Sequence, residues 1–258
     1  MPTKPKSEKR RLDVLVVERG LAGSREKAQA MILAGEVRVN GERSEKAGTQ
    51  IPIDARIEIS GASLKYASRA GFKLEGALED FGVSAEGKAC LDIGSSTGGF
   101  TDCLLQHGAR RVYAVDVTPE QMAWRLQQDA RVTRVKENAR HLRPEQIPEP
   151  ADLVTLDVSF IAAAKVIPAV AAAAGPGAEF LILVKPQFEL DRADIGAGGI
   201  VRDAAQHEKA VERVREAAVA AGLAIGGVKP SKVAGAEGNQ EFFLHAWKKQ
   251  AGESPASE

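Results

Sequence analysis

The chain has 258 residues, of which 44% are hydrophobic and 27% are charged, and its formal net charge is zero. This composition excludes a long disordered protein and a uniformly basic nucleic-acid binder, and the length predicts one large domain with a smaller one. The charge is unevenly distributed, because residues 1–75 carry 15 Lys and Arg against 10 Asp and Glu. We therefore expect a modestly basic N-terminal module beside a mildly acidic body.

Cysteine usage and hydropathy predict a cytoplasmic protein. Cys90 and Cys103 form neither a disulfide framework nor a metal-ligand spacing with the four histidines, so we expect a reducing compartment and no metal. The N-terminus lacks the apolar segment of a secretory signal. The alanine-rich stretch 160–175 is interrupted by Lys165 and Pro168 and is too short for a membrane span, so we expect a buried helix and no membrane partner.

The first sixty residues have the pattern of a compact module. Apolar residues with helical spacing follow residue 11 and end at Gly20, and Ser24 is a suitable N-cap for a second helix. The Asn-Gly pair at 40–41 follows a short alternating stretch, which is the strongest local signal for a hairpin. Two short helices and a hairpin are therefore predicted within residues 1–60, after a disordered N-terminal tail.

This module resembles the small RNA-binding domain typified by small-subunit ribosomal protein four. The resemblance rests on the stretch RLDVLVVERGLAGSREKAQAMILAGEVRVNG. It implies that basic side chains on the helix pair face structured RNA. Taken singly, each of these charges could be an ordinary solvated one, but as a set they favour RNA, and a local patch is enough to neutralise phosphates. The RNA-binding candidates are Arg11, Arg25, Lys27 and Arg38.

After a Ser-, Gly- and Ala-containing linker at 61–67, the pattern at 68–249 is that of an α/β domain, followed by a disordered tail at 250–258. Strand-like runs alternate with helical stretches, which is typical of a sheet with crossover connections. The last two runs follow each other without a helix, so we expect an antiparallel final strand. The runs lie at 89–93, 111–117, 132–136, 152–158, 179–185, 223–229 and 241–247.

A glycine-rich turn between the first strand and the next helix is the candidate cofactor site. The spacing in DIGSSTGGF is neither that of a dinucleotide site nor that of a Walker loop, and a purely structural turn is the alternative. It resembles the first motif of S-adenosylmethionine-dependent methyltransferases, which implies a doubly wound Rossmann-like sheet and that cofactor. Asp116 ends the second strand, where an acidic side chain can accept hydrogen bonds from ribose hydroxyls.

The same resemblance implies that Asp92 and Gly94 line the methionine end of the cofactor. Asn138 follows the third strand and is a candidate adenine contact, although Asn at such a position is often a turn residue. The complete set of cofactor-binding candidates is Asp92, Gly94, Ser95, Gly98, Gly99, Phe100, Asp116, Asn138 and Asp157.

Four charged residues are the catalytic candidates. Asp157 and Lys185 end the fourth and fifth strands, Glu241 begins the last one, and Lys73 lies at the start of the helix leading into the sheet. A lysine after the buried run 180–184 is costly, and that cost favours a functional role over a strand-end lysine that reaches solvent. The Asn/Asp-Pro-Pro-aromatic motif of base amino-methyltransferases does not occur here.

The order Lys, Asp, Lys, Glu resembles the tetrad of FtsJ-type ribose 2′-O-methyltransferases. Together with the N-terminal module and the motifs SRAGFKL, LDVSFI, LVKPQFE, GGIVRD and GNQEFFL, it resembles the TlyA family, also known as haemolysins. The linker lacks the tryptophan-containing element that some members have. The resemblance implies methylation of a ribosomal-RNA ribose, with a cytidine in small- or large-subunit RNA as the target and Lys185 acting on the 2′-hydroxyl. We expect Asp157 and Glu241 to orient Lys185, and Lys73 to limit the negative charge of the cluster.

Other functions remain open at this point. A base methyltransferase, a ribose methyltransferase acting on another RNA and a non-catalytic ribosome assembly factor built on the same fold are alternatives. A membrane-active haemolysin has no amphipathic or membrane-spanning segment in its favour. Free ribosomal RNA or an assembled subunit could be the partner, and a monomer is the favoured oligomeric state.

Overall fold

The structure is a computed structural model, and it describes residues 8–250 apart from residues 20, 23, 34, 45, 60–64, 236 and 237. The expected tails over 1–7 and 251–258, the helix stop at Gly20 and residues 61–64 of the expected linker lie outside these described residues. The chain divides after Leu64 into two compact units, called unit 1 and unit 2 below.

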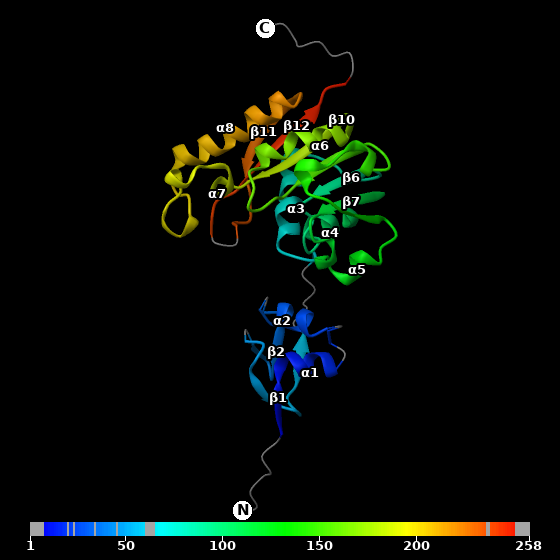
Figure 1. Cartoon of the computed structure of the whole chain (residues 1–258), viewed down its shortest axis with the longest axis vertical. Coiled ribbons are helices and arrows are strands. Elements are labelled where there is room, and N and C mark those ends of the chain that lie inside the picture. Colours follow the sequence, from blue (N-terminus) through cyan, green and yellow to red (C-terminus); the bar gives the residue numbers. More distant parts are fainter. Residues whose placement is uncertain are drawn as a thin grey trace, which may run out of the picture. The chain divides into compact units, whose positions relative to one another are not determined.

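Unit 1 combines two short helices with small antiparallel sheets (Figure 1). Its helices are α1 (Leu12–Glu18) and α2 (Arg25–Leu33), and its strands are β1 (Lys9–Arg11), β2 (Val37–Val39), β3 (Glu42–Arg43), β4 (Gln50–Pro52) and β5 (Ile57–Ile59). Strand β1 pairs with β4, and β2 lies between β3 and β5. The β2–β3 hairpin turns at Asn40 and Gly41, whose φ angles of 52° and 88° are those that an Asn-Gly pair favours.

A buried carboxylate connects both helices of unit 1. The side chain of Asp13 is fully buried and accepts hydrogen bonds from Arg11 at 2.9 Å, Arg25 at 3.0 Å and Gln29 at 2.9 Å. Hydrogen bonding from Arg11 holds the pKa of Asp13 well below its usual range. Two of the predicted RNA-binding arginines therefore also stabilise the fold of this unit.

Unit 2 is built on a seven-stranded sheet in the order β11-β12-β10-β9-β6-β7-β8. Strand β12 is antiparallel to both of its neighbours, whereas the other neighbouring pairs run parallel. This arrangement confirms the predicted doubly wound α/β sheet with an antiparallel last strand. The strands are β6 (Ala89–Ile93), β7 (Arg111–Asp116), β8 (Val132–Lys136), β9 (Ala151–Leu156), β10 (Ala174–Val184), β11 (Leu223–Pro230) and β12 (Phe242–Lys248).

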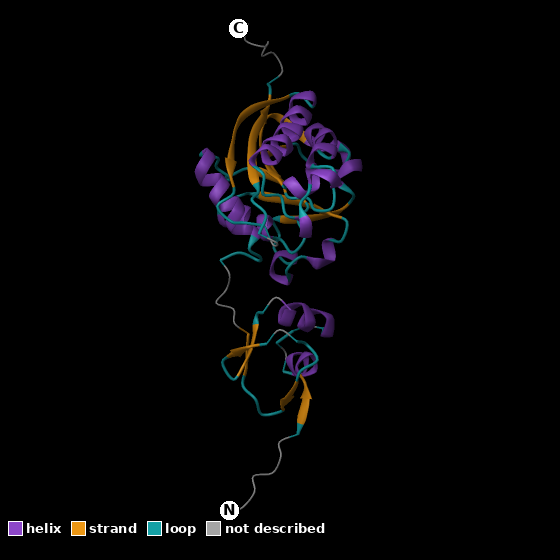
Figure 2. Ribbon diagram, turned by 90° about the vertical axis from the view of Figure 1, so that its left-hand side faces the viewer, coloured by secondary structure: helices purple, strands orange, loops and turns teal. Residues whose placement is uncertain are grey.

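Helices cover both faces of this sheet (Figure 2). One buried cluster joins the sheet to α6 and α8 through residues such as Val170 and Val214, and the other joins it to α3 and α4 through residues such as Leu74 and Leu104. The helices of unit 2 are α3 (Ala70–Phe81), α4 (Gly99–Gln106), α5 (Trp124–Gln127), α6 (Ile167–Ala173), α7 (Pro186–Glu189) and α8 (Ala204–Ala220). Short 3₁₀ turns lie at η1 (Pro119–Gln121), η2 (Ala139–His141), η3 (Pro144–Gln146), η4 (Ala163–Lys165), η5 (Arg192–Asp194) and η6 (Ala197–Gly199).

The alanine-rich stretch 160–175 differs from the single buried helix that its composition predicts. It forms the turn η4 and then the seven-residue helix α6, and strand β10 already begins at Ala174. Pro168 sits in the first turn of α6, where its missing N–H costs no helical hydrogen bond. Pro168 therefore lies at the start of a new helix and does not interrupt a longer one.

Residues 65–67 of the expected linker pack into unit 2. The Tyr66 side chain is buried, and the Ala67 amide donates to Asp102 Oδ2 at 2.6 Å. Among the helices that the structure describes, none has the length and apolar character needed to cross a membrane.

Candidate active site at the carboxyl edge of the sheet

A cavity of about 590 Å³ opens where the strand order reverses. From β6 the chain builds outward to β7 and β8, and it then returns to β9 on the other side of β6. The residues that follow these strands line the cavity, among them Gly94 after β6, Glu137 after β8 and Asp157 after β9. Open α/β sheets bind ligands at this kind of reversal, because the two outgoing connections leave a crevice there.

The glycine-rich turn brings its backbone close to the neighbouring strand ends. Gly94 has a φ of 81°, and a Cβ placed on it would lie 2.3 Å from the Asp157 carbonyl oxygen. Gly98 has a φ of 93°, and its Cβ would lie 2.4 Å from Leu126. Both positions therefore favour glycine for conformation, and at Gly94 the backbone contact also leaves no space for a side chain. Gly94 borders the cavity, whereas Gly98 packs against the α5 segment.

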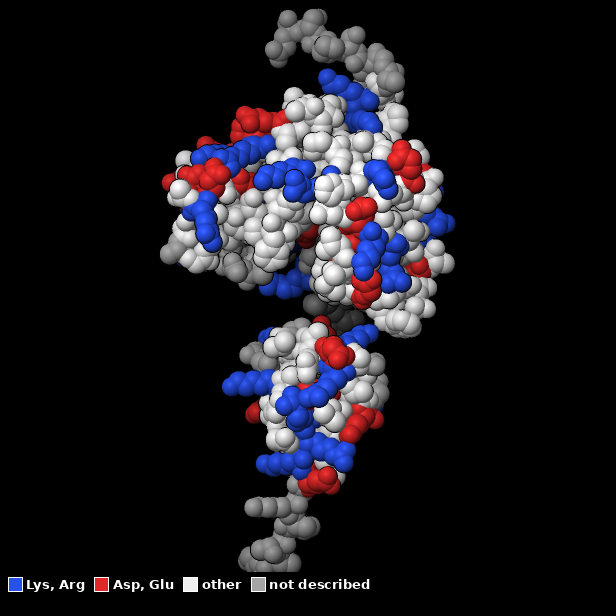
Figure 3. Space-filling view, viewed as in Figure 1, with Lys and Arg blue, Asp and Glu red and all other residues white. Residues whose placement is uncertain are grey.

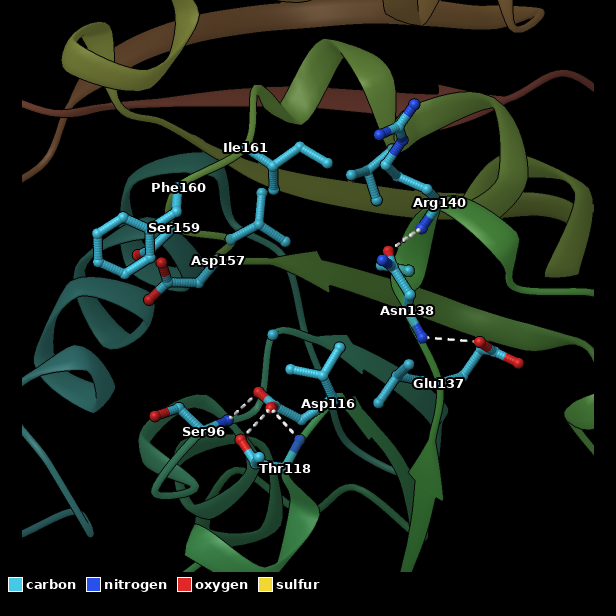
Figure 4. A pocket seen from close by; sticks show the side chains of 16 residues that line it. Ser96, Asp116, Thr118, Glu137, Asn138, Arg140, Asp157, Ser159, Phe160 and Ile161 are labelled. Carbon is cyan, nitrogen blue, oxygen red and sulfur yellow. Dashed lines mark hydrogen bonds between the residues drawn. The ribbon is translucent and has the colours of Figure 1, made fainter.

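Asp116 lies at the end of β7 on the cavity wall (Figure 4). Its carboxylate accepts hydrogen bonds from the Ser96 amide at 2.9 Å and from the Thr118 amide and hydroxyl at 2.9 and 3.2 Å. An ionised carboxylate has about four acceptor directions. Asp116 thus holds the glycine-rich turn in place and keeps acceptor capacity for a ligand in the cavity.

Asn138 lines the same cavity and also has the local role that such a residue often takes. Its side-chain oxygen accepts the Arg140 amide at 3.1 Å and caps the turn η2. The neighbouring Glu137 accepts the Asn138 amide at 2.8 Å (Figure 4). Because the side-chain oxygen is engaged, the amide NH₂ of Asn138 is the group suited to a ligand.

A smaller cavity of about 150 Å³ shares Gly94, Ser96, Asp157 and Ser159 with the first. Its wall also includes the candidates Ser95, Gly99 and Phe100, together with Lys185. Ser95 is buried, and its hydroxyl has no hydrogen-bond partner within the described part of the chain. Buried hydroxyls are normally paired, so this one is suited to bind a ligand atom.

Lys185 is held by the loop that follows β9. Its Nζ lies 2.5 Å from Asp157 Oδ1 and donates to Ser159 Oγ at 2.8 Å. The side chain is only 10% exposed and borders the smaller cavity. These two oxygen partners fix the orientation of the Lys185 side chain. The predicted pair of Asp157 and Lys185 is therefore present at this edge of the sheet.

Lys73 and Glu241 form a second buried ion pair, with 2.6 Å between Lys73 Nζ and Glu241 Oε2. The strand register, in which Val184 pairs with Phe242, places Glu241 opposite Lys185, one position beyond the last pair. The prediction had Glu241 orient Lys185, whereas the hydrogen bond of its carboxylate goes to Lys73. The four residues are therefore arranged as two neighbouring pairs.

Asp92 lies below the cavities and lines neither of them. It is fully buried, and it accepts the hydroxyls of Thr101 at 2.6 Å and Thr155 at 3.1 Å. Burial raises the pKa of Asp92 to about 7. Its observed contacts connect β6 to α4 and β9, which supports the glycine-rich turn from beneath.

Buried cysteines contribute no reactive thiolate to the site. Burial raises the pKa values of Cys90 and Cys103 to about 12, so both thiols are protonated near neutral pH. Across the described ranges, no group of three or more His, Cys, Asp and Glu side chains is arranged to hold a metal ion.

Two neighbouring residues at the cavity were not singled out from the sequence. Ser159 accepts the hydrogen bond from Lys185, and Phe160 exposes 94% of its surface at the cavity wall with a φ of 65° (Figure 4). Both lie in the motif LDVSFI, which was assigned to the family as a whole. Phe160 could not be singled out from the sequence, because its exposure beside the polar pocket depends on the conformation of the loop.

Comparisons with known proteins identify relatives for both units. Residues 66–248 match the family described as FtsJ-like methyltransferase, and residues 10–57 match the S4 domain. The "16S/23S rRNA (cytidine-2'-O)-methyltransferase TlyA" of Mycobacterium tuberculosis is 42% identical over 236 residues, which cover 91% of this chain and 88% of that protein. "Hemolysin A" of Brachyspira hyodysenteriae is 41% identical over 237 residues, which cover 91% and 98% of the two chains.

Solved structures give the same result for the fold. A hemolysin candidate from Streptococcus thermophilus is 42% identical with a TM-score of 0.72, and the match covers 95% of this chain and 90% of that chain. A methyltransferase candidate from Listeria monocytogenes is 17% identical with a TM-score of 0.51, over 71% of this chain and all of that chain. At that identity the second likeness concerns the fold alone.

Proposed function

Because the chain belongs to the TlyA family of methyltransferases, in which an S4 domain precedes an FtsJ-like domain, we propose that it methylates a ribose 2′-hydroxyl of ribosomal RNA. The observation that carries this proposal is the buried Lys185, held by Asp157 and Ser159 beside a cavity at the carboxyl edge of the sheet. The name of the Mycobacterium tuberculosis relative points to a cytidine as the target.

The residues around the cavity fit S-adenosylmethionine. A volume of about 590 Å³ suits a nucleoside-sized ligand, because small-molecule sites span roughly 300–1,000 Å³. Asp116 offers a carboxylate for the ribose hydroxyls, and the Asn138 amide can face the adenine. Ser95 offers an unpaired buried hydroxyl near the methionine end, where Gly94 also lies. When bound, this cofactor would supply a methyl group attached to a sulfonium sulfur, which leaves as a neutral thioether once the methyl group is transferred.

The role proposed for Lys185 follows from the weakness of a ribose hydroxyl as a nucleophile. The hydroxyl must lose its proton, wholly or in part, as the new O–C bond forms. A neutral Lys185 amine can take that proton, whereas a charged Lys185 can stabilise the oxygen as it becomes negative. Asp157 and Ser159 fix the direction of its Nζ in either case. Most of the remaining rate enhancement would come from positioning.

Lys73 and Glu241 are proposed to set the charge around this centre. Their ion pair is almost completely buried, and removal of one partner would leave the other charge unpaired. Glu241 lies opposite Lys185 across the strand register, so the pair adds a carboxylate near Lys185 without adding net charge. We expect single substitutions in this pair to damage stability as well as turnover.

Unit 1 is proposed to supply affinity for RNA. Lys and Arg side chains occupy much of the face of this unit that Figure 3 draws, with acidic side chains at fewer places. Lys27 and Arg38 are exposed, and Arg11 and Arg25 are about half exposed while they also hold Asp13. We propose residues 1–60 as the RNA-binding part and 68–249 as the catalytic part, acting on ribosomal RNA or a subunit in the cytoplasm.

The 2′-hydroxyl itself provides the test of the proposed reaction. Ribosomal subunits that lack the modification should accept labelled methyl groups from S-adenosylmethionine, and mapping should place the label on one ribose. A substrate with a 2′-deoxy nucleotide at that position should accept no label, because the attacking oxygen is missing. Labelling of the deoxy substrate would contradict ribose methylation and would favour a base methyltransferase.

Replacement of Asp116 by alanine should weaken S-adenosylmethionine binding by about one to two orders of magnitude, because a hydrogen bond to a charged group contributes roughly 1.5–3 kcal/mol. Affinity for RNA should stay close to that of the wild type. Calorimetric titration with the cofactor measures the effect, and Glu120→Ala is a control, since Glu120 is an exposed acid of the neighbouring turn that does not line the cavity. Equal cofactor affinity in Asp116→Ala and wild type would refute this role.

A further inference from the structure

Two chain segments provide the groups that surround the reacting centre. The loop 157–163 carries Asp157 and Ser159, and the segment 185–189 begins with Lys185 and forms the short helix α7. The ion pair of Lys185 with Asp157 and its hydrogen bond to Ser159 require these segments to keep a fixed distance. The contacts that hold the loop against α7 therefore determine the orientation of the Lys185 side chain.

Glu189, the last residue of α7, makes that connection. Its Oε1 accepts the Ala163 amide at 2.5 Å, at the point where the loop enters the turn η4. The side chain is only 5% exposed, and Oε2 has no hydrogen-bond partner among the described residues. A buried carboxylate with one free oxygen is costly, so its position has to be explained by the contact it makes.

The loop needs such an attachment because its conformation is strained. Phe160 has a φ of 65°, a left-handed conformation that is strained for a residue with a Cβ, and it exposes 94% of its surface. Its ring lies 5.5 Å from the ring of Phe188, the residue before Glu189. These two contacts of the loop with α7 come from adjacent residues of that helix.

We propose that Glu189 is a positioning residue for methyl transfer, whose carboxylate fastens the loop 157–163 to the segment that carries Lys185. This inference depends on the proposed function for its effect on rate, whereas the fastening of the loop can be measured without any reaction. Glu189 touches neither cavity wall, so it acts through Asp157, Ser159 and Lys185.

The attachment should depend on pH. Burial raises the pKa of Glu189 to about 7, against the opposing effect of the Ala163 and Ala164 amides and the charges of Arg213 on α8 and Lys165 on η4. Above pH 7 the ionised carboxylate is a strong acceptor for the Ala163 amide. As the pH falls through 7 the group becomes protonated and a weaker acceptor, so the loop should loosen and the rate should decrease.

Glu189→Ala and Glu189→Gln separate this role from a general effect on folding. Glutamine keeps an oxygen that can accept the Ala163 amide but cannot titrate. Glu189→Ala should lose hydrogen-exchange protection over 157–163 and lower the rate at saturating substrates by at least about tenfold, with little change in cofactor affinity. Glu189→Gln should keep the protection, restore the rate to within about threefold at pH 8, and lack the decrease near pH 7.

Glu212→Gln is the matched control, because Glu212 is an exposed carboxylate of α8 that pairs with Arg215. It should behave as the wild type in both measurements. Unchanged exchange over 157–163 in Glu189→Ala would overturn the proposal, and so would a loss of exchange protection over 157–163 near pH 7 that persists in Glu189→Gln. If wild-type protein methylated no ribosomal RNA, the proposed function would fail, while the exchange measurement would still support or overturn the attachment.

Discussion

Replacement of Lys185 by alanine is expected to lower the rate constant for methyl transfer at saturating substrates by at least about two orders of magnitude. The Nζ of this lysine is fixed 2.5 Å from Asp157 and 2.8 Å from Ser159, at the edge of the smaller cavity. A group placed at the reacting centre contributes more to the transition state than to substrate binding. Affinities for S-adenosylmethionine and RNA should therefore change little, as single-turnover kinetics and separate binding titrations would measure.

Two further variants sharpen this experiment. Lys185→Arg keeps the positive charge but cannot accept a proton near neutral pH, so activity well above that of Lys185→Ala would favour a purely electrostatic role. Lys209→Ala removes an exposed lysine of α8 that pairs with Asp194, and it should leave the rate unchanged. A near-normal rate in Lys185→Ala would mean that this lysine does not act on the 2′-hydroxyl.

Deletion of residues 1–64 should abolish methylation of ribosomal RNA while unit 2 stays folded and binds S-adenosylmethionine. Unit 2 has its own sheet and two buried clusters, and the break before Lys65 keeps the contacts of Tyr66 and Ala67. The cofactor-binding candidates all lie beyond the deletion. Circular dichroism, cofactor titration and the labelling assay together measure this outcome.

A milder variant tests the same assignment without removing a domain. Lys27→Glu with Arg38→Glu changes exposed charges that do not hold Asp13, and it should reduce RNA affinity and its salt dependence, because each phosphate contact releases counterions. Arg11→Glu and Arg25→Glu are poorer probes, since both arginines hold the buried Asp13. Undiminished methylation by the truncated chain would contradict an RNA-binding role for unit 1.

The fold of unit 2 was largely predictable because its central strands β6, β7, β9 and β10 are mostly apolar and buried. β6 and β8 have the predicted limits, and the absence of a helix before β12 indicated its reversed direction. The motifs that carry Asp116, Asp157 and Lys185 follow such strands, and parallel strands bring their carboxyl ends to one edge. The local sequence was therefore sufficient to predict that these three residues lie at one edge of the sheet.

Other features depended on contacts between distant segments. Glu241 was expected to orient Lys185, but Lys73 of α3 lies within 2.6 Å of its carboxylate, and no local pattern encodes that choice. Asp92 belongs to the same motif as Gly94, yet the alternation of side chains along β6 directs it toward Thr101 and Thr155. The exposure of Phe160 is likewise a property of the folded loop.

Because β12 runs antiparallel to its neighbours, one residue of the candidate site is attached to the sheet differently from the others. In a wholly parallel sheet, the residues at the ligand edge follow the strands, so each is attached to a crossover connection that is fixed by a packed helix. Glu241 instead precedes its strand and is delivered by the connection from β11, residues 231–241, which contains no helix among its described residues. Insertions or deletions in that connection would alter the approach to Lys185 from one side while the strand register stays intact.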